Sequence, residues 1–304
     1  MLPNPCGTAF GLRFHSNRPL PELSAVVDAD ADSPLVTVDW APPEPQLPLP
    51  GPKPFRLTDA GFELAVPDLC NFLITPSSIG IAPAPGVDEQ SIRAYLLGSA
   101  MGALLHLRGL TVFHGSAVAL PDGTAAVFCG QSTAGKSTLA ATLAARGYPA
   151  LADDVTAVRL DADGRAWCLP GLARTKLWRD ALERLGLSEQ ANAHTQVLPD
   201  LDKHCLPIQT AAHATLLTRF YELQVDEPSS QPLQFTALFG MDKLHVLLAN
   251  VYRSGYLKAM GRQHGLLAGA AQLARALAMQ RITRPRQGNT LPAIVDGLES
   301  QWGR

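Results

Sequence analysis

The octapeptide GQSTAGKS at residues 130–137 constrains the fold more than any other part of the sequence. It fits the pattern G-x-x-x-x-G-K-[ST] at every fixed position. An apolar stretch at 125–129 precedes it, and an Ala/Leu-rich stretch runs from Ser137 to a helix-ending Gly147. The sequence therefore predicts a strand, a glycine-rich loop and a helix in that order, which is the local context of a phosphate-binding loop. We call residues 130–137 the P-loop segment.

The chemistry of this pattern is the capture of phosphate. Its glycines let successive backbone N–H groups converge on phosphate oxygens, and the N-terminus of the following helix adds partial positive charge. Lys136 adds a full positive charge, and the Ser137 hydroxyl is expected to coordinate Mg²⁺. The sequence therefore predicts binding of ATP with Mg²⁺, although a glycine-rich turn could match the pattern by chance. The expected nucleotide-binding residues are Gly130, Gln131, Ser132, Thr133, Ala134, Gly135, Lys136, Ser137 and Thr138.

Charge and cysteine content narrow the setting in which such a chain would work. Lys and Arg number 25 against 27 Asp and Glu, and the net charge of −2 provides no general attraction for nucleic acid or an anionic membrane. No apolar run reaches the roughly 18 residues that span a bilayer. The five cysteines are widely spaced without a C-x-x-C pair, and the N-terminus resembles no signal peptide. We therefore expect a reduced, cytoplasmic protein, and assembly into a homo-oligomer stays open.

The chain is expected to fold as two domains. Residues 9–27 and 35–40 resemble strands, the proline-rich stretch 41–54 resembles a connector, and 55–83 alternates apolar and polar residues as two or three antiparallel strands would. Residues 1–85 are thus predicted to form a β-rich N-terminal domain. Residues 86–304 alternate helical and strand patterns and are predicted to form an α/β domain that contains the P-loop segment.

The sequence of this second domain predicts several individual helices and strands. Residues 88–108 have helical spacing, and 110–130 are typical of a strand, an Asp-Gly turn and a second strand. Residues 187–210 show no regular pattern. The other expected elements are strands at 149–160, 165–169, 214–224 and 233–238 and helices at 137–146, 177–186, 266–279 and 291–302.

Two adjacent acids, Asp153 and Asp154, follow Lys136 by 17 and 18 positions in a small, apolar context. Neighbouring like charges raise one pKa, so in a phosphate site one carboxylate could serve a metal ion while the other accepts a proton from an attacking hydroxyl. His114 ends an earlier strand and could orient an aspartate or contact the terminal phosphate. An exposed Asp-Asp turn and a structural histidine are the alternatives.

These three elements resemble, in order and spacing, the HPr kinase/phosphorylase family, whose members phosphorylate a serine of a protein. The matching residues are His114-Gly115, the P-loop segment and Leu151-Ala152-Asp153-Asp154. The resemblance implies an α/β P-loop kinase core of the HPr kinase/phosphoenolpyruvate carboxykinase-like type. It also implies that Asp153 is the general base assisted by His114, that Ser137 binds Mg²⁺, and that Asp154 lies at the metal and phosphates.

Residues 169–178, LPGLARTKLW, depart from the family's glycine-rich second signature. Together with the β-rich N-terminus they resemble the HPr-kinase-like enzymes of lasso-peptide and other ribosomal peptide pathways, which phosphorylate a serine of a precursor peptide. The expected partner is therefore a peptide or small protein that carries the acceptor serine. Arg174, Lys176 and Lys203 are candidates to stabilise charge or hold the substrate, and each could equally be a surface cation.

Three other functions remain open. A regulatory NTPase switch would usually carry an N-K-x-D element, which the sequence lacks. A nucleotide-binding scaffold would bind ATP without turnover. A small-molecule kinase would share the P-loop core, because a hydroxyl acceptor leaves no trace in the sequence of its enzyme.

Overall fold

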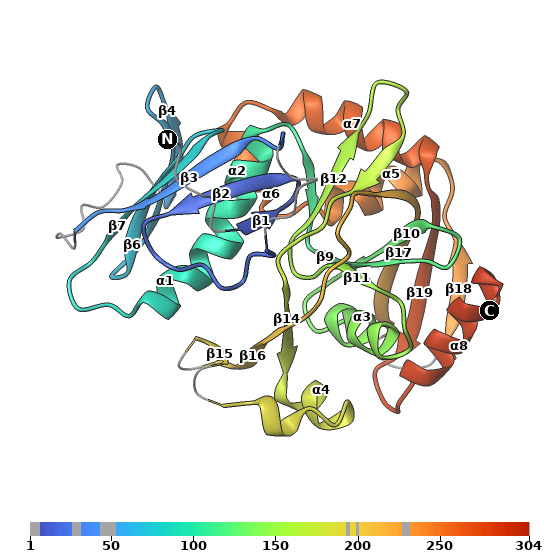
Figure 1. Cartoon of the computed structure of the whole chain (residues 1–304). Helices are drawn as coiled ribbons and strands as arrows, with labels where there is room; N and C mark the ends of the chain where they lie inside the picture. The colour runs from blue at the N-terminus through green and yellow to red at the C-terminus, as the bar shows by residue number, and fades with distance from the viewer. Residues whose placement is uncertain are drawn as a thin grey trace.

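The computed structural model describes residues 7–25, 32–42, 53–192, 195–198, 201–226 and 232–303 of the chain. It is a mixed α/β fold with three sheets (Figure 1). Within these residues, no helix is both long and apolar enough to cross a membrane. Most of the proline-rich connector expected at 41–54 lies outside the described residues.

The first sheet is built from the N-terminal part of the chain and has the order β1-β2-β3-β7-β6-β5-β4. The pairs β2–β3 and β3–β7 are parallel, and the other neighbours are antiparallel. A strand was expected over 9–27, but the second strand ends at Ser16, and the antiparallel strands of 55–83 number four. The strands are β1 (Gly7–Ala9), β2 (Leu12–Ser16), β3 (Leu35–Trp40), β4 (Phe55–Thr58), β5 (Gly61–Val66), β6 (Cys70–Ile74) and β7 (Ser78–Pro83).

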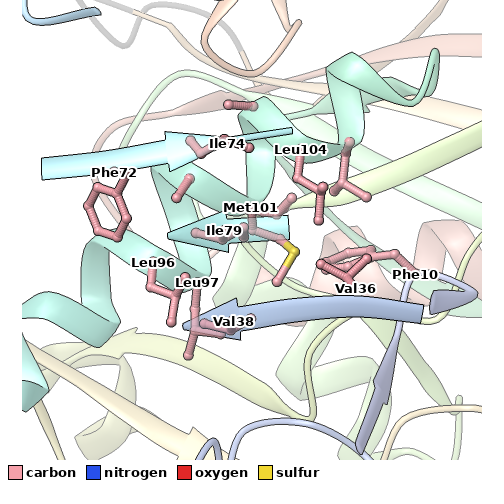
Figure 2. Close-up of a cluster of buried hydrophobic side chains, with 14 of the residues drawn as sticks. Phe10, Val36, Val38, Phe72, Ile74, Ile79, Leu96, Leu97, Met101 and Leu104 are labelled. Carbon is pink, nitrogen blue, oxygen red and sulfur yellow. The ribbon is translucent and has the colours of Figure 1, made fainter. Parts of the chain in front are cut away.

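A long helix covers one face of this sheet. It runs as α1 (Glu89–Tyr95), a π-helical turn η2 (Leu96–Ala100) and α2 (Met101–Leu107), and it begins where the Asp88 carboxylate accepts the backbone N–H of Ser91. Figure 2 shows the resulting core. Alternate residues of the strands point at the buried side of the helix; the labelled side chains are Phe10, Val36, Val38, Phe72, Ile74, Ile79, Leu96, Leu97, Met101 and Leu104.

This core crosses the boundary that the sequence suggested near residue 85. The same cluster includes Tyr252, Tyr256 and Met260 from the C-terminal half. The ring of Tyr256, on α6 (Ser254–Ala259), lies 5.0 Å from that of Phe62 on β5. The first sheet is therefore packed directly against the rest of the molecule.

The second sheet carries the P-loop segment on its central strand. Strand β10 (Thr124–Gly130) lies between β9, to which it is antiparallel, and β17 (Thr215–Asp226), to which it is parallel; β19 (Ala278–Pro285) extends the parallel part. The predicted Asp-Gly turn joins β9 to β10. The remaining strands are β8 (Thr111–Phe113), β9 (Gly115–Ala119), β11 (Ala150–Ala152), β12 (Thr156–Leu160), β13 (Ala166–Cys168) and β18 (Gln234–Ala237).

Helices cover both faces of this sheet, so its central strands are apolar on both sides. On one face α3 and α8 pack around Phe128 and Tyr148; on the other α5 and α7 pack around Phe113 and Phe220. The helices at 177–186 and 266–279 are shorter or shifted, and that at 291–302 is as predicted. The bounds are α3 (Lys136–Ala145), α8 (Leu291–Trp302), α5 (Gly240–Ala249) and α7 (Gln263–Ala276).

The third sheet, with the order β14-β16-β15, projects beside the P-loop helix α3 (Figure 1). Leu177 and Leu206 form a small core with α4 that reaches Ala141 on α3. Residues 187–210 were expected to be irregular, but they contain two of these strands. The helix expected at 177–186 begins only at Arg179, because 177–178 are the end of a strand. The elements are β14 (Arg174–Trp178), α4 (Arg179–Arg184), η3 (Ser188–Gln190), β15 (Gln196–Leu198) and β16 (Leu201–Pro207).

Candidate active site

The P-loop segment forms the turn between β10 and α3 that the sequence predicted. Gly130 and Gly135 have φ values of 138° and 102°, and Thr133 between them has 68°. A Cβ at Gly130 would lie 2.3 Å from the backbone oxygen of Leu223 on the neighbouring strand, so only glycine fits there. The loop therefore depends both on left-handed backbone and on close approach to β17.

The Lys136 side chain is folded back over this loop. Its Nζ donates to the backbone oxygens of Gly130 and Gln131, each 2.9 Å away. Burial lowers the pKa of Lys136 below its ordinary value, because taking the ammonium out of water disfavours its charged form. The amine lies at the base of the loop, where it could contact a bound phosphate.

Two contacts that the sequence did not predict hold the loop from outside. The side-chain oxygen of Asn250 accepts the backbone N–H of Gly130 at 2.9 Å. The guanidinium of Arg284 donates to the backbone oxygen of Ala134 through two nitrogens, each at 3.3 Å. Asn250 follows α5, and Arg284 lies at the end of β19. Both ends of the loop are thus tied to distant parts of the chain.

The P-loop segment opens into a cleft of about 1860 Å³. Small-molecule sites usually measure about 300–1,000 Å³, so this cleft exceeds what one nucleotide needs. Its walls are formed by helix α1 with the turn η2, by the third sheet, by the end of β17 and by the segment between β19 and α8. Representative lining residues from these walls are Tyr95, Trp178, Glu222 and Thr290.

The two neighbouring aspartates face different surroundings. The Asp153 side chain is buried, and its oxygens accept hydrogen bonds from the Ser116 hydroxyl (2.6 Å), the Thr175 hydroxyl (2.9 Å) and the backbone N–H of Lys176 (2.8 Å). These contacts tie β9 and β14 to the segment after β11. Asp153 does not line the cleft, whereas Asp154 does.

Asp154 has a left-handed backbone (φ 70°), a conformation that aspartate adopts more readily than most residues do. Its carboxylate lies 2.6 Å from Lys176 Nζ and 3.6 Å from His114 Nδ1. Burial alone would raise the pKa of the Asp154 carboxyl, but the charge and hydrogen bond of Lys176 hold it well below its usual range. Asp154 is therefore ionised at neutral pH.

His114 is brought to this carboxylate as the sequence suggested. Its Nδ1 also lies 3.1 Å from the backbone oxygen of Asp154, and its own backbone N–H donates to the backbone oxygen of Asn250. Burial, aided by the positive charge of Lys136, lowers the pKa of His114, so the neutral imidazole is favoured at pH 7. With Nδ1 protonated, the ring can donate to the Asp154 backbone oxygen.

The three cations that the sequence suggested for the site do not all lie in the cleft. Lys176 and Lys203 line the cleft, and the Lys203 ammonium lies 5.6 Å from the centre of the Trp178 ring. Arg174 lies outside that cleft, is buried, and donates to the backbone oxygen of Leu97. Sequence reasoning missed several cleft arginines because they follow no motif; they are Arg184, Arg253, Arg281, Arg284 and Arg286.

The donors in the cleft fit Mg²⁺ bound together with a nucleotide. Within the described residues, no three His, Cys, Asp or Glu side chains cluster to hold a metal unaided. Mg²⁺ is usually held by one or two carboxylates with substrate phosphates supplying further oxygens, and it seldom has an all-protein cage. Ser137 and Asp154, the predicted pair, both line the cleft, and Glu222 adds a carboxylate beside the loop.

The similarity of this chain to known proteins is limited. No family model matches the sequence, and no curated protein matches it. Among solved structures, the chain is similar to the HPr(Ser) kinase/phosphatase from Coxiella burnetii, with 11% identity and a TM-score of 0.33 over 62% of this chain and 94% of that one. At this TM-score the likeness supports neither a fold nor a function for this chain.

Proposed function

We propose that the protein binds ATP with Mg²⁺ and transfers its terminal phosphoryl group to a hydroxyl, with a serine in a peptide as the acceptor. One observation carries the proposal: the P-loop segment, the Lys136 ammonium and the ionised Asp154 carboxylate line the same cleft. A nucleotide-binding scaffold would need the first two, but it would not need a carboxylate held beside them by a lysine and a histidine.

In the proposed complex the phosphates lie on the P-loop segment. The terminal phosphoryl group would lie near Lys136 and Asp154, and the nucleoside would occupy another part of the same cleft. The Ser137 hydroxyl, with the carboxylate of Asp154 or Glu222, would hold Mg²⁺, which neutralises phosphate charge when it is bound. Lys136 and the backbone N–H groups of the loop neutralise the rest.

Asp154, rather than Asp153, serves as the general base in this proposal. The acceptor oxygen attacks the terminal phosphorus, the bond to the bridging oxygen breaks, ADP leaves, and the hydroxyl proton passes to the Asp154 carboxylate late in the step. Lys176 keeps Asp154 deprotonated, and His114 holds its backbone. Asp153 is unsuited to the role because three protein donors already bind its oxygens.

The size of the cleft supports an acceptor larger than water. Beyond Asp154 it continues between helix α1 with the turn η2 on one side and the third sheet on the other. We propose that this part receives a peptide, of the kind represented by ribosomal (lasso) precursor peptides, while HPr-like proteins remain the alternative acceptor. A regulatory NTPase without transfer is the second alternative.

The test is intact-mass analysis of precursor peptides encoded by neighbouring genes, incubated with the protein, ATP and Mg²⁺. A gain of one phosphate on a serine supports the proposal. ADP that forms at the same rate with and without every peptide favours the NTPase, and ATP binding without any ADP favours a scaffold.

A further inference from the structure

Arg253 lines the cleft but has no part in the reaction described so far. It connects α5 to α6 and has φ 49°, a left-handed conformation that residues other than glycine, asparagine and aspartate seldom adopt. Neighbouring structure imposes this conformation, because the preceding Tyr252 donates its backbone N–H to Val112 and packs its ring against the helix glycine Gly102.

Its guanidinium is held at a fixed place. Nη2 donates to the Ser99 hydroxyl at 3.0 Å, and the guanidinium carbon lies 5.8 Å from the centre of the Tyr252 ring. Ser99 is buried in η2, a π-helical turn, and such turns often occur at functional sites. Two segments separated by about 150 residues in sequence thus fix one cation in the cleft.

The charge of Arg253 is available to a ligand. Arg281 is neutralised by Glu222 at 2.7 Å, and Arg184 pairs with Asp180. In the described part of the chain, by contrast, no carboxylate lies within ion-pair distance of Arg253. The Tyr252 ring that Arg253 approaches lies 5.9 Å, centre to centre, from the His114 ring, and His114 in turn lies beside the Asp154 carboxylate. These contacts place the Arg253 guanidinium on the side of the cleft where transfer would occur.

We infer that Arg253 is a further catalytic residue, whose guanidinium contacts the phosphoryl group while it passes to the acceptor. This inference rests on the proposed function. A planar guanidinium can donate to two equatorial oxygens of the transferring group, and charge that builds there is the main quantity such enzymes stabilise. Ser99 is the corresponding positioning residue, since it holds the guanidinium.

The test compares binding of MgADP with binding of MgADP plus aluminium fluoride, a mimic of the transferring phosphoryl group, by calorimetry. Wild type should bind the mimic more tightly than MgADP. Arg253→Ala should bind MgADP as wild type does but lose the extra affinity, and its kcat for transfer should fall by about 10³-fold. Guanidinium ion in the buffer should restore part of kcat, which a merely structural role would not allow.

Matched variants sharpen the result. Arg253→Lys keeps the charge without the planar fork and should recover little of the lost kcat. Ser99→Ala should lower kcat less than Arg253→Ala does. Lys258 is an exposed cation on α6 outside the cleft, and Lys258→Ala should change neither kcat nor binding of the mimic. Equal binding of the mimic by wild type and Arg253→Ala overturns the inference alone. A wild type that binds no MgADP overturns the proposed function, and this inference with it.

Discussion

The side-chain oxygen of Asn250 accepts the backbone N–H of Gly130 at 2.9 Å, across 120 residues of sequence. The amide nitrogen of the same side chain donates to the Val246 oxygen on α5. The backbone oxygen of Asn250 accepts from the N–H of His114. One residue therefore links the start of the P-loop segment to His114, which lies between β8 and β9.

Replacing Asn250 by Ala should weaken ATP binding. The variant leaves the buried N–H of Gly130 without its partner, which costs about 1–3 kcal/mol, and it frees the first residue of the loop. We expect a loss of affinity measurable by calorimetry and a lower free energy of unfolding. Asn250→Asp keeps the acceptor oxygen and should retain more stability, but its negative charge should weaken ATP binding. Unchanged affinity in Asn250→Ala would show that the loop needs no such support.

The adjacent aspartates should respond differently to the same change. Asp154→Asn removes the proposed base and should lower kcat by about 10²–10⁴-fold with ATP binding largely retained. Asp153→Asn replaces an acceptor-only carboxylate, bound by three donors, with an amide that must turn an NH₂ toward one of them. Its main effect should be a loss of about 1–3 kcal/mol in unfolding free energy. Phosphotransfer and chemical denaturation on both variants separate the roles; a catalytic loss confined to Asp153→Asn would reverse the assignment.

Some of this site could be predicted from the sequence because its signals are local. The P-loop segment is contiguous, and the strand and helix around it have clear apolar patterns, as has the helix at 291–302. The pair at 153–154 was found as a pair, but its two environments depend on donors from β9 and β14 and on one left-handed residue. Spacing along the chain carries no information about those contacts.

Other parts of the site and of the fold could not be predicted from the sequence, for a related reason. Asn250 and Arg253 sit in a connection without motif or periodicity, and only the fold brings them to the cleft. The last two residues of strand β14 were predicted to begin a helix, and the strand itself was not predicted, because its five residues lack the alternation of a half-buried strand: four of them are buried. Tertiary pairing with β16 decides its conformation.

Lys136→Met should weaken both ATP binding and phosphotransfer. The substitution removes the ammonium that the proposal places on the terminal phosphate and leaves the oxygens of Gly130 and Gln131 without their donor. We expect a fall in kcat of about 10²–10³-fold, comparable to the loss of one donor to a developing anion. Retained thermal stability would show that the loss arises at the ligand rather than in the fold. Wild-type affinity for ATP in this variant would contradict the phosphate role.

Gly130→Ala should be among the most damaging small substitutions in the chain. A methyl group there would lie 2.3 Å from the Leu223 oxygen, and the backbone φ of 138° adds strain. Gly123→Ala is the matched control, because Gly123 also has positive φ (79°) but has open space around its Cβ position. We expect Gly130→Ala to lose much more stability than Gly123→Ala in denaturant unfolding and to bind ATP poorly. Similar losses in both would attribute the requirement to backbone angle alone.

The pH dependence of transfer should report the pair formed by Lys176 and Asp154. The pKa of the Asp154 carboxyl is lowered by Lys176 against the opposing effect of burial, so the wild-type rate should persist below the ordinary aspartate value of about 3.9 wherever the fold survives. Lys176→Met removes the largest lowering influence and should move the acidic limb of the kcat profile to higher pH.

The same pair has a signature in stability. Because the folded pKa of Asp154 lies below its unfolded value, its contribution to the free energy of unfolding is complete above the unfolded pKa and is lost as pH falls through the folded one. Lys176→Met should therefore show a smaller decline in stability between neutral and acidic pH than wild type does, measured by denaturant titration. Arg165, an exposed cation paired with Asp161, provides the control: Arg165→Met should leave the acidic limb of the rate unmoved. An identical limb in wild type and Lys176→Met would remove Asp154 as the titrating base.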